Sequence, residues 1–241
     1  MKKHCTAIVL AAGSGTRMKS DIPKQFMLLG GKPLIWYSLR AVEQSEIIDE
    51  CILVAAEDEI PYVQSEIVDK FGFHKVKTLL AGGRERWESV GNAVAVLEEP
   101  EKEGYVFIHD GARPFLTEEI LGNTYEAVQK YGACVAAVPS KDTVKLADAA
   151  GFAASTPDRS RVWIVQTPQV FERGLILGAY RELQKRALEI GRENIEVTDD
   201  ASVVESFTDC RVRLAEGSYR NIKVTTPEDM RIAEAFLNSK G

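Results

Sequence analysis

Short apolar runs alternate with longer amphipathic segments through the first half of the chain. The runs have the length and composition of strands buried on both faces of a sheet, and they occupy residues 6–12, 51–56, 75–80, 105–109 and 133–138. Between the third and fourth runs, apolar residues at spacings of three and four predict one buried face of a helix: Trp87, Val90, Val94 and Leu97. This alternation predicts an α/β fold of Rossmann-like type, with a mainly parallel twisted sheet and helices on both faces.

Local signals place the other elements. We expect Pro33 and Pro61 at the first positions of two helices, the first of them ending near Gln44. Three further helices are predicted over 117–131, over 175–190 and from Thr198 onward, and the last helix is expected to have Thr226 as its N-cap and Pro227 at its first position. Residues 166–169 are interpreted as a loop, and residues 211–214 and 221–224 as late strands.

The regular alternation is interrupted between residues 139 and 162. Two short polar runs flank a turn of small residues, Ala149-Ala150-Gly151. This pattern predicts a hairpin that protrudes from the body, and such a hairpin needs a partner because it has little core of its own. We therefore expect residues 1–241 to form a single domain, with 139–162 as a dimerisation β-arm.

Composition excludes several classes of protein. The 30 basic and 36 acidic residues give a net charge of −6, which opposes general attraction to nucleic acid or to an acidic membrane surface. No apolar run approaches the roughly 18 to 20 residues that cross a bilayer. The four cysteines are scattered, which favours buried reduced thiols and a cytoplasmic location over disulfides or a zinc site.

A turn rich in small residues follows the first predicted strand. Leu10-Ala11-Ala12-Gly13-Ser14-Gly15-Thr16-Arg17-Met18 has backbone N–H groups that can surround an anion, with Arg17 inside the turn and Pro23-Lys24 just downstream. A dinucleotide fingerprint is excluded because Met18 stands near the place of the third glycine. A Walker loop is excluded because no Gly-Lys-Ser/Thr follows.

The turn and several later segments together resemble one family. The first motif and Pro23-Lys24-Gln25 are similar to the signature of nucleotidylyltransferases that act on sugar and polyol phosphates. Five further segments resemble the 2-C-methyl-D-erythritol 4-phosphate cytidylyltransferase family of the non-mevalonate isoprenoid pathway: 109–114 (HDGARP), Asp142-Thr143, Thr167-Pro168-Gln169, 198–202 (TDDAS) and 221–225 (NIKVT). The resemblance covers essentially the whole chain.

The resemblance implies transfer of CMP from CTP to the polyol phosphate, with release of pyrophosphate. Arg17, Lys24 and Lys223 would bind the triphosphate and stabilise the charge that develops on the transferring group. The nucleotide would contact a set of small residues, Ala11, Ala12, Gly13, Ser14, Gly15, Thr16, Gly82, Gly83 and Ser89. Arg84 stands where the family more often has Asp, which leaves its part in base recognition open.

The resemblance also assigns the metal and the acceptor. Asp110 ends a predicted strand, where open α/β sheets bind ligands, and it is the candidate Mg²⁺ ligand and a substrate contact. His109 is interpreted as a packing residue. The acceptor would be bound by Arg113, Thr167 and Thr198, together with Thr143 and Arg159 from the arm of the other subunit of a homodimer. Arg159 would also be catalytic.

Two other functions remain open. A ribitol 5-phosphate cytidylyltransferase would use the same chemistry on a different acceptor. A nucleotide-binding protein of the same fold that has lost turnover is the third possibility, and the joint presence of Lys24, Asp110 and Lys223 argues against it.

Overall fold

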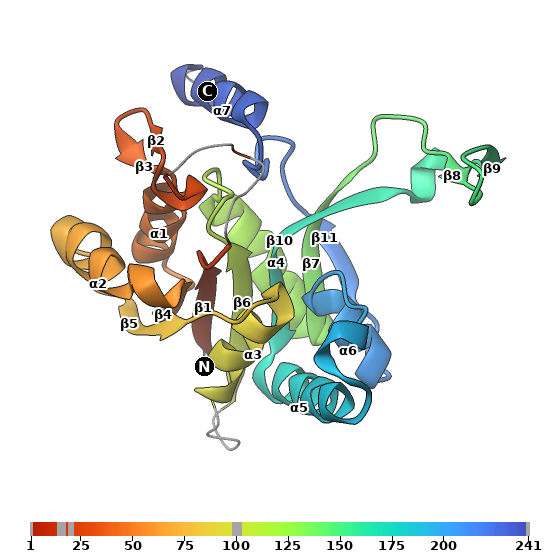
Figure 1. The fold of residues 1–241 in the computed structure, drawn as a ribbon, viewed down its shortest axis with the longest axis horizontal. Coiled ribbons are helices and arrows are strands. Elements are labelled where there is room, and N and C mark those ends of the chain that lie inside the picture. Colours follow the sequence, from red (N-terminus) through yellow and green to blue (C-terminus); the bar gives the residue numbers. More distant parts are fainter. Residues whose placement is uncertain (1, 14–17, 19–21, 98–102, 240–241) are drawn as a thin grey trace.

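A twisted sheet forms the centre of the molecule (Figure 1). The computed structural model describes residues 2–13, 18, 22–97 and 103–239. Within these residues the main sheet has seven strands, in the order β11-β7-β10-β6-β1-β4-β5. The strands are β1 (His4–Leu10), β4 (Glu50–Ala55), β5 (Val76–Ala81), β6 (Gly104–Asp110), β7 (Ala133–Pro139), β10 (Trp163–Glu172) and β11 (Arg213–Glu216).

The sheet is mainly parallel, as the alternation predicts. β1 pairs in parallel with β4 and β6, β4 with β5, and β11 with β7. Only β10, among these strands, runs antiparallel to both of its neighbours, β6 and β7. The α/β class with its mainly parallel sheet is therefore confirmed.

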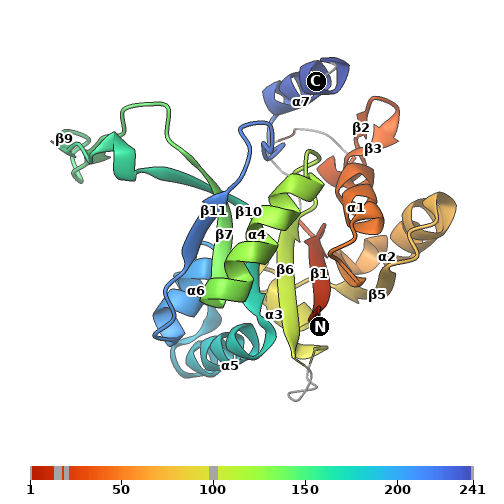
Figure 2. The same ribbon diagram turned by 180° about the vertical axis from the view of Figure 1, so that it is seen from behind.

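Helices cover both faces of the sheet, as the views from opposite sides show (Figures 1 and 2). On one face lie α1 (Leu34–Gln44), α4 (Glu118–Tyr131) and α2 (Ile60–Tyr62), which continues as a π-helix over Val63–Asp69. On the other face lie α3 (Arg86–Ala95), α5 (Arg173–Ile190) and α6 (Asp200–Phe207). The last helix, α7 (Pro227–Asn238), packs near the small hairpin of β2 (Leu28–Leu29) and β3 (Lys32–Pro33).

The two-residue period of the strands divides the core between these faces. In β6, Tyr105 and Phe107 pack into the cluster with α1 and α4, whereas Val106 and Ile108 pack into the cluster with α3 and α5. All four side chains are buried, which explains why the run is apolar throughout instead of alternating with polar residues. None of the described helices is long and apolar enough to cross a membrane.

The structure corrects several local expectations. Residues 166–169 belong to β10 and are not a loop, and residues 221–224 form no strand. Pro33 is the N-cap of α1, which begins at Leu34, and α2 begins at Ile60, one residue before Pro61. The helix expected from Thr198 begins at Asp200, with Asp199 as its N-cap. The expected start of α7 is confirmed, because the Thr226 side chain accepts a hydrogen bond from the backbone N–H of Asp229.

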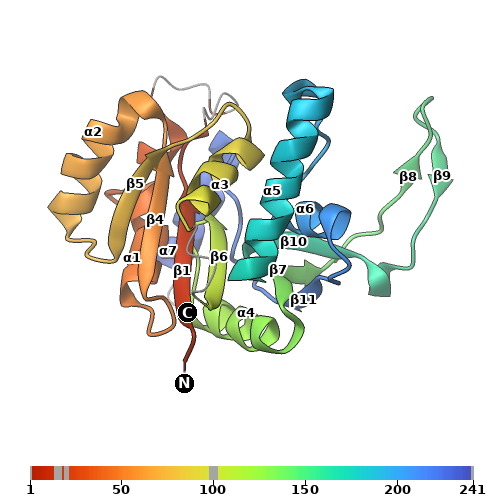
Figure 3. The same ribbon diagram turned by 90° about the horizontal axis from the view of Figure 1, so that it is seen from below.

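A hairpin stands away from the body between β7 and β10 (Figure 3). Its two short strands, β8 (Leu146–Ala147) and β9 (Ala153–Ser155), pair antiparallel around the turn at Gly151. The legs continue the pairing of the main sheet, since Trp163 pairs with Pro139 and the N–H of Ser140 donates to the carbonyl oxygen of Val162. The arm is therefore an extension of the β7–β10 pair.

Candidate active site

A cavity of about 180 Å³ lies where β1 and β6 end. Its walls bring together segments that are far apart in the sequence: Leu10 to Gly13, Lys24, Gln25, Gly83 to Arg86, Ser89, Asp110, Ala112 and Lys223. The predicted metal ligand Asp110 and the predicted phosphate-binding residues Lys24 and Lys223 thus line one cavity. Its place beyond the carboxyl ends of parallel strands is where open α/β sheets bind ligands.

Asp110 is the electrostatic centre of this cavity. Its Oδ2 lies 2.8 Å from Nζ of Lys223, and its Oδ1 accepts a hydrogen bond of 3.3 Å from Nε of Arg86. Burial by itself would raise the pKa of this carboxyl group, but the charges of Arg86 and Lys223 outweigh burial and hold the pKa well below its usual range. Asp110 is therefore an anion at neutral pH.

Arg113 is a largely buried cation with an incomplete set of partners, and its side chain is 11% exposed. One Nη donates a 2.7 Å hydrogen bond to the carbonyl oxygen of Asn221, whereas Nε is buried without a hydrogen-bond partner. Oδ2 of Asp110 lies 4.0 Å from that Nε. Burial, the main influence, lowers the pKa of Arg113. A largely buried guanidinium with an unused donor is suited to receive an anion.

His109 links Asp110, Arg113 and Thr167 through hydrogen bonds. Its Nε2 lies 3.2 Å from the carbonyl oxygen of Arg113, and because a carbonyl only accepts, this nitrogen carries the proton. Nδ1 then accepts from the hydroxyl of Thr167 at 3.0 Å, and the same hydroxyl oxygen accepts the backbone N–H of Asp110 at 3.1 Å. The expectation that His109 is a packing residue agrees with its 1% exposure, and these bonds also fix the backbone at Asp110.

We expect the buried imidazole to make folding stability depend on pH. Burial lowers the pKa of His109 to about 4, below the ordinary value of 6.5. Between these pH values the unfolded chain binds more protons than the folded one. The contribution of the neutral imidazole to the free energy of unfolding is therefore complete above about pH 6.5 and falls as the pH approaches 4. Between about pH 7 and pH 5 the loss from this group should be about 2 kcal/mol.

Urea unfolding of the wild type and of His109→Gln at these two pH values measures this loss. The variant cannot take up the proton, so its stability should change less with pH by about 2 kcal/mol. An equal change in both proteins would contradict the assignment of a neutral imidazole.

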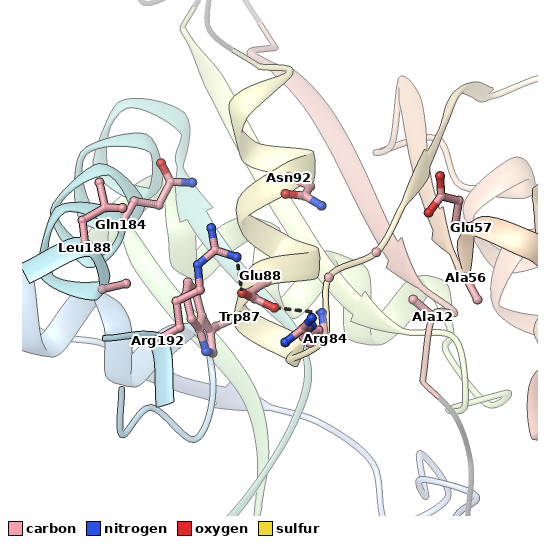
Figure 4. A pocket seen from close by; sticks show the side chains of 13 residues that line it. Ala12, Ala56, Glu57, Arg84, Trp87, Glu88, Asn92, Gln184, Leu188 and Arg192 are labelled. Atoms are coloured by element: carbon pink, nitrogen blue, oxygen red, sulfur yellow. Dashed lines mark hydrogen bonds and ion pairs between the residues drawn. The ribbon is translucent and has the colours of Figure 1, made fainter. Parts of the chain in front are cut away.

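A larger cavity of about 780 Å³ adjoins the first and shares Ala12, Gly83 and Arg84 with it. Figure 4 shows this cavity between the end of β4, the first turns of α3 and the side of α5. A Cβ at Gly82 would lie 2.4 Å from Cβ of Ala12, so only glycine lets the β5 loop pass so close to β1. The predicted nucleotide contacts Ala12, Gly82 and Gly83 thus line its wall.

Side chains from α3 hold the glycine loop in shape. The Ser89 hydroxyl accepts the N–H of Gly83 and donates to the carbonyl oxygen of Glu85. One oxygen of Glu88 accepts the N–H of Arg84, and the other is 3.0 Å from Arg192. The two interactions of Glu88 are seen in Figure 4, where Glu88 lies between Arg84 and Arg192. Arg84 is thus an exposed residue whose backbone is fixed by the first turn of the helix.

Other predicted site residues lie elsewhere or outside the described residues. Ser14, Gly15, Thr16 and Arg17 are not among the residues that the structure describes. Thr143 and Arg159 are exposed on the arm, and the lining of both cavities is formed without them within one chain. Thr198 is exposed beside a small separate cavity of about 60 Å³.

The structure adds residues that sequence reasoning does not single out. Arg86 lines the smaller cavity and forms ion pairs with Asp110 and with Asp200, which is completely buried. Gln25 is also in the wall; its Nε2 donates to Glu59, and its Oε1 is buried without a partner. Asp200 lies inside the 198–202 segment and Gln25 follows Lys24. Their positions within these motifs could therefore have identified both as candidate site residues. No sequence signal connects Arg86 to Asp200, since 114 residues separate them.

Comparisons with known proteins agree with this geometry. The family model described as IspD, 2-C-methyl-D-erythritol 4-phosphate cytidylyltransferase, matches residues 5–239. A protein of that name from Lachnospira eligens is 50% identical over 232 residues, which cover 96% of this chain and 98% of the relative. A protein of the same name from Clostridium kluyveri is 45% identical over 233 residues, which cover 97% of this chain and 96% of the relative.

Solved structures give the same result for the fold. The crystal structure of 4-diphosphocytidyl-2C-methyl-D-erythritol synthase from Anaerococcus prevotii matches with a TM-score of 0.83 and 34% identity. The match covers 98% of this chain and 96% of that chain. Since the family model and these relatives span nearly the whole sequence, the chain belongs to the 2-C-methyl-D-erythritol 4-phosphate cytidylyltransferase family.

Proposed function

We propose that this enzyme transfers the cytidylyl group of CTP to 2-C-methyl-D-erythritol 4-phosphate. The reaction forms 4-diphosphocytidyl-2-C-methyl-D-erythritol and releases pyrophosphate. One observation carries the proposal: Lys24, Lys223 and the ionised Asp110 line one cavity next to the small residues of the β1 turn, in a chain that belongs to this family. Transfer of a phosphoryl-type group depends on positioning and cationic stabilisation more than on covalent catalysis, and this cavity provides both.

The nucleotide is proposed to lie across the two adjoining cavities. The triphosphate would contact Ala11 to Gly13, together with Lys24 and Lys223 in the smaller cavity. Cytosine and ribose would lie toward Gly82 and Gly83, which line the larger cavity. The Ser89 hydroxyl already donates its proton to the carbonyl oxygen of Glu85. Its role toward the base would therefore be indirect: by accepting the N–H of Gly83, it fixes the backbone of the loop that lines the cavity.

Magnesium is proposed as the metal that accompanies CTP. Asp110 supplies one carboxylate, and the described residues contain no group of three or more His, Cys, Asp and Glu side chains that could hold an ion by themselves. A single carboxylate suits Mg²⁺, which keeps water ligands and takes the rest from phosphate oxygens. Bound with the nucleotide, the ion would reduce the negative charge of the phosphates.

The acceptor phosphate is proposed to meet Arg113. The buried Nε of Arg113 lacks a hydrogen-bond partner. Oδ2 of Asp110 lies 4.0 Å from this atom, so the ion pair between the two side chains is a weak one. Thr167 has its hydroxyl proton committed to His109, so this side chain would meet the acceptor as a hydrogen-bond acceptor and not as a donor. Thr198, which lies just before the N-cap of α6, would complete the contacts.

A homodimer with shared sites is proposed for the remaining contacts. Thr143 and Arg159 lie on the arm, away from both cavities of their own chain. Two apolar side chains of the arm are exposed, Phe152 at 71% and Leu146 at 55%. Their exposure favours burial of the arm against a second copy of the chain. Arg159 of one subunit would then bind the acceptor phosphate at the site of the other, through two guanidinium N–H groups.

The cell compartment is proposed to be the cytoplasm. All four cysteines, each in the described part of the chain, are free thiols, and burial raises the pKa of Cys5, Cys51 and Cys134 to about 12. Buried unpaired thiols are typical of reducing compartments.

Measurement of pyrophosphate release tests the function. The purified enzyme is given CTP and Mg²⁺ with either 2-C-methyl-D-erythritol 4-phosphate or ribitol 5-phosphate, and kcat/KM is compared. We expect turnover with the methylerythritol phosphate at least about 100-fold above that with the ribitol phosphate. Preference for ribitol phosphate would assign the alternative cytidylyltransferase. No turnover with either acceptor would favour a non-catalytic nucleotide-binding protein.

A further inference from the structure

Asp200 is a buried carboxylate beside the proposed site. It is the first residue of α6 and is 0% exposed. Its two oxygens accept hydrogen bonds of 2.9 and 2.8 Å from the two Nη atoms of Arg86, and Oδ1 also accepts one of 2.7 Å from the hydroxyl of Tyr180. Three elements, α3, α5 and α6, thus meet at this one carboxylate.

Among the described residues, three cations pair with two carboxylates in this region. Arg86, Lys223 and Arg113 form ion pairs with Asp110, and Arg86 also forms one with Asp200. The distances show which carboxylate holds each cation most closely. Arg86 is held more closely by Asp200, at 2.8 and 2.9 Å, than by Asp110, at 3.3 Å. Lys223 is the closest cation to Asp110, at 2.8 Å, and Arg113 remains at 4.0 Å.

We propose that Asp200 is a positioning residue for the transfer site: by holding Arg86 through both Nη atoms, it leaves Asp110 to orient Lys223. This inference rests on the proposed function. Asp200 is absent from the lining of both adjoining cavities, whereas Arg86 lines the smaller one, so Asp200 would act through Arg86. Without its charge, Arg86 would have Asp110 as its only carboxylate among its described partners. It would then compete with Lys223 for that group.

Asp200→Asn removes the charge and keeps the shape of the side chain. Because Lys223 acts on charge that develops during the transfer, we expect kcat to fall by at least about tenfold, with KM for CTP changed less than about threefold. Tyr180→Phe is the matched variant, because it removes a hydrogen bond from the same carboxylate and leaves the Arg86–Asp200 ion pair in place. We expect its kcat to stay within about threefold of the wild type.

A double-mutant cycle shows whether Asp200 acts through Arg86. In the Arg86→Gln background, Asp200→Asn should change kcat by less than about twofold, because the cation that it controls is gone. The melting temperature of every variant is measured alongside, so that a loss of folded protein is not counted as a loss of rate. The same loss of kcat in both backgrounds, or a loss in Tyr180→Phe equal to that in Asp200→Asn, would overturn the proposal.

Wild-type turnover keeps the two hypotheses apart. If the wild type does not transfer the cytidylyl group, the proposed function fails. If it does, and the cycle is additive, only the role of Asp200 fails.

Discussion

Replacement of Lys223 by methionine is expected to lower kcat about 100- to 1,000-fold, as removal of one donor to a developing negative charge does in other enzymes. The side chain of Lys223 is 37% exposed, lines the smaller cavity and lies 2.8 Å from Asp110. Methionine has a similar length and no charge, so it removes the cation with little change of packing. Steady-state release of pyrophosphate with saturating CTP and acceptor measures the effect.

Lys70→Met is the matched control for this variant. Lys70 forms an exposed ion pair with Glu66 at the end of the π-helix, and it is absent from the lining of the cavities. Its kcat should equal that of the wild type, and exposed pairs of this kind contribute at most about 1 kcal/mol to stability. A kcat within about tenfold of the wild type for Lys223→Met would show that Lys223 is not a transition-state cation.

Mixed subunits should recover activity from two variants that are each inactive alone. Lys24→Ala removes a cation from the cavity of its own subunit, and Arg159→Ala removes one from the arm. If the arm serves the partner's site, a heterodimer has one intact site, formed by the Lys24 of one chain and the Arg159 of the other. Random exchange of equal amounts should therefore restore about a quarter of wild-type activity.

The control mixture combines Lys24→Ala with the double variant Lys24→Ala/Arg159→Ala. Every site in that mixture lacks Lys24, so no activity should return. Exchange of subunits is verified by mass spectrometry of differently tagged chains. If exchange is complete and the first mixture stays inactive, the hypothesis that the arm of one subunit contributes Arg159 to the site of the other is wrong.

The sequence predicts most strands of the sheet because a strand that is buried on both faces has a continuous run of apolar residues. Apolar runs such as Tyr105 to Ile108 arise because both faces of the strand need apolar side chains. The segment 166–169 escapes this rule. Its proline and polar residues argue against a central strand, yet the pairing with β7 shifts between Val165 and Gln169, and this irregularity accommodates them.

Residues 221–224 illustrate the opposite error. Their alternation is typical of a strand, but the backbone makes long-range contacts in place of a ladder. The N–H of Val224 donates to the carbonyl oxygen of Ala112, and the Asn221 amide donates to the carbonyl oxygen of Thr167. These bonds place Lys223 next to Asp110, and no local pattern of hydrophobicity encodes them.

The same limit applies to the site. Asp110 and Lys24 could be predicted because each stands in a recognisable local motif. The place of Arg86 could not, because it depends on Asp200 and Tyr180, which are distant in the sequence and meet it only when α3, α5 and α6 pack together. Likewise, the commitment of the Thr167 hydroxyl to His109 follows only from the pairing of β10 with β6.

The continuity of the arm with the β7–β10 pair has a consequence for folding. Two antiparallel strands joined by a tight turn form at small entropic cost, whereas here a loop of about twenty residues separates Ser140 from Val162. Closing that loop costs about 2 kcal/mol more than closing a turn of two or three residues. If the arm contacts a second copy, as proposed, those contacts would offset this cost. The pairing of β7 with β10 would then be a point at which association of subunits stabilises the fold of each one.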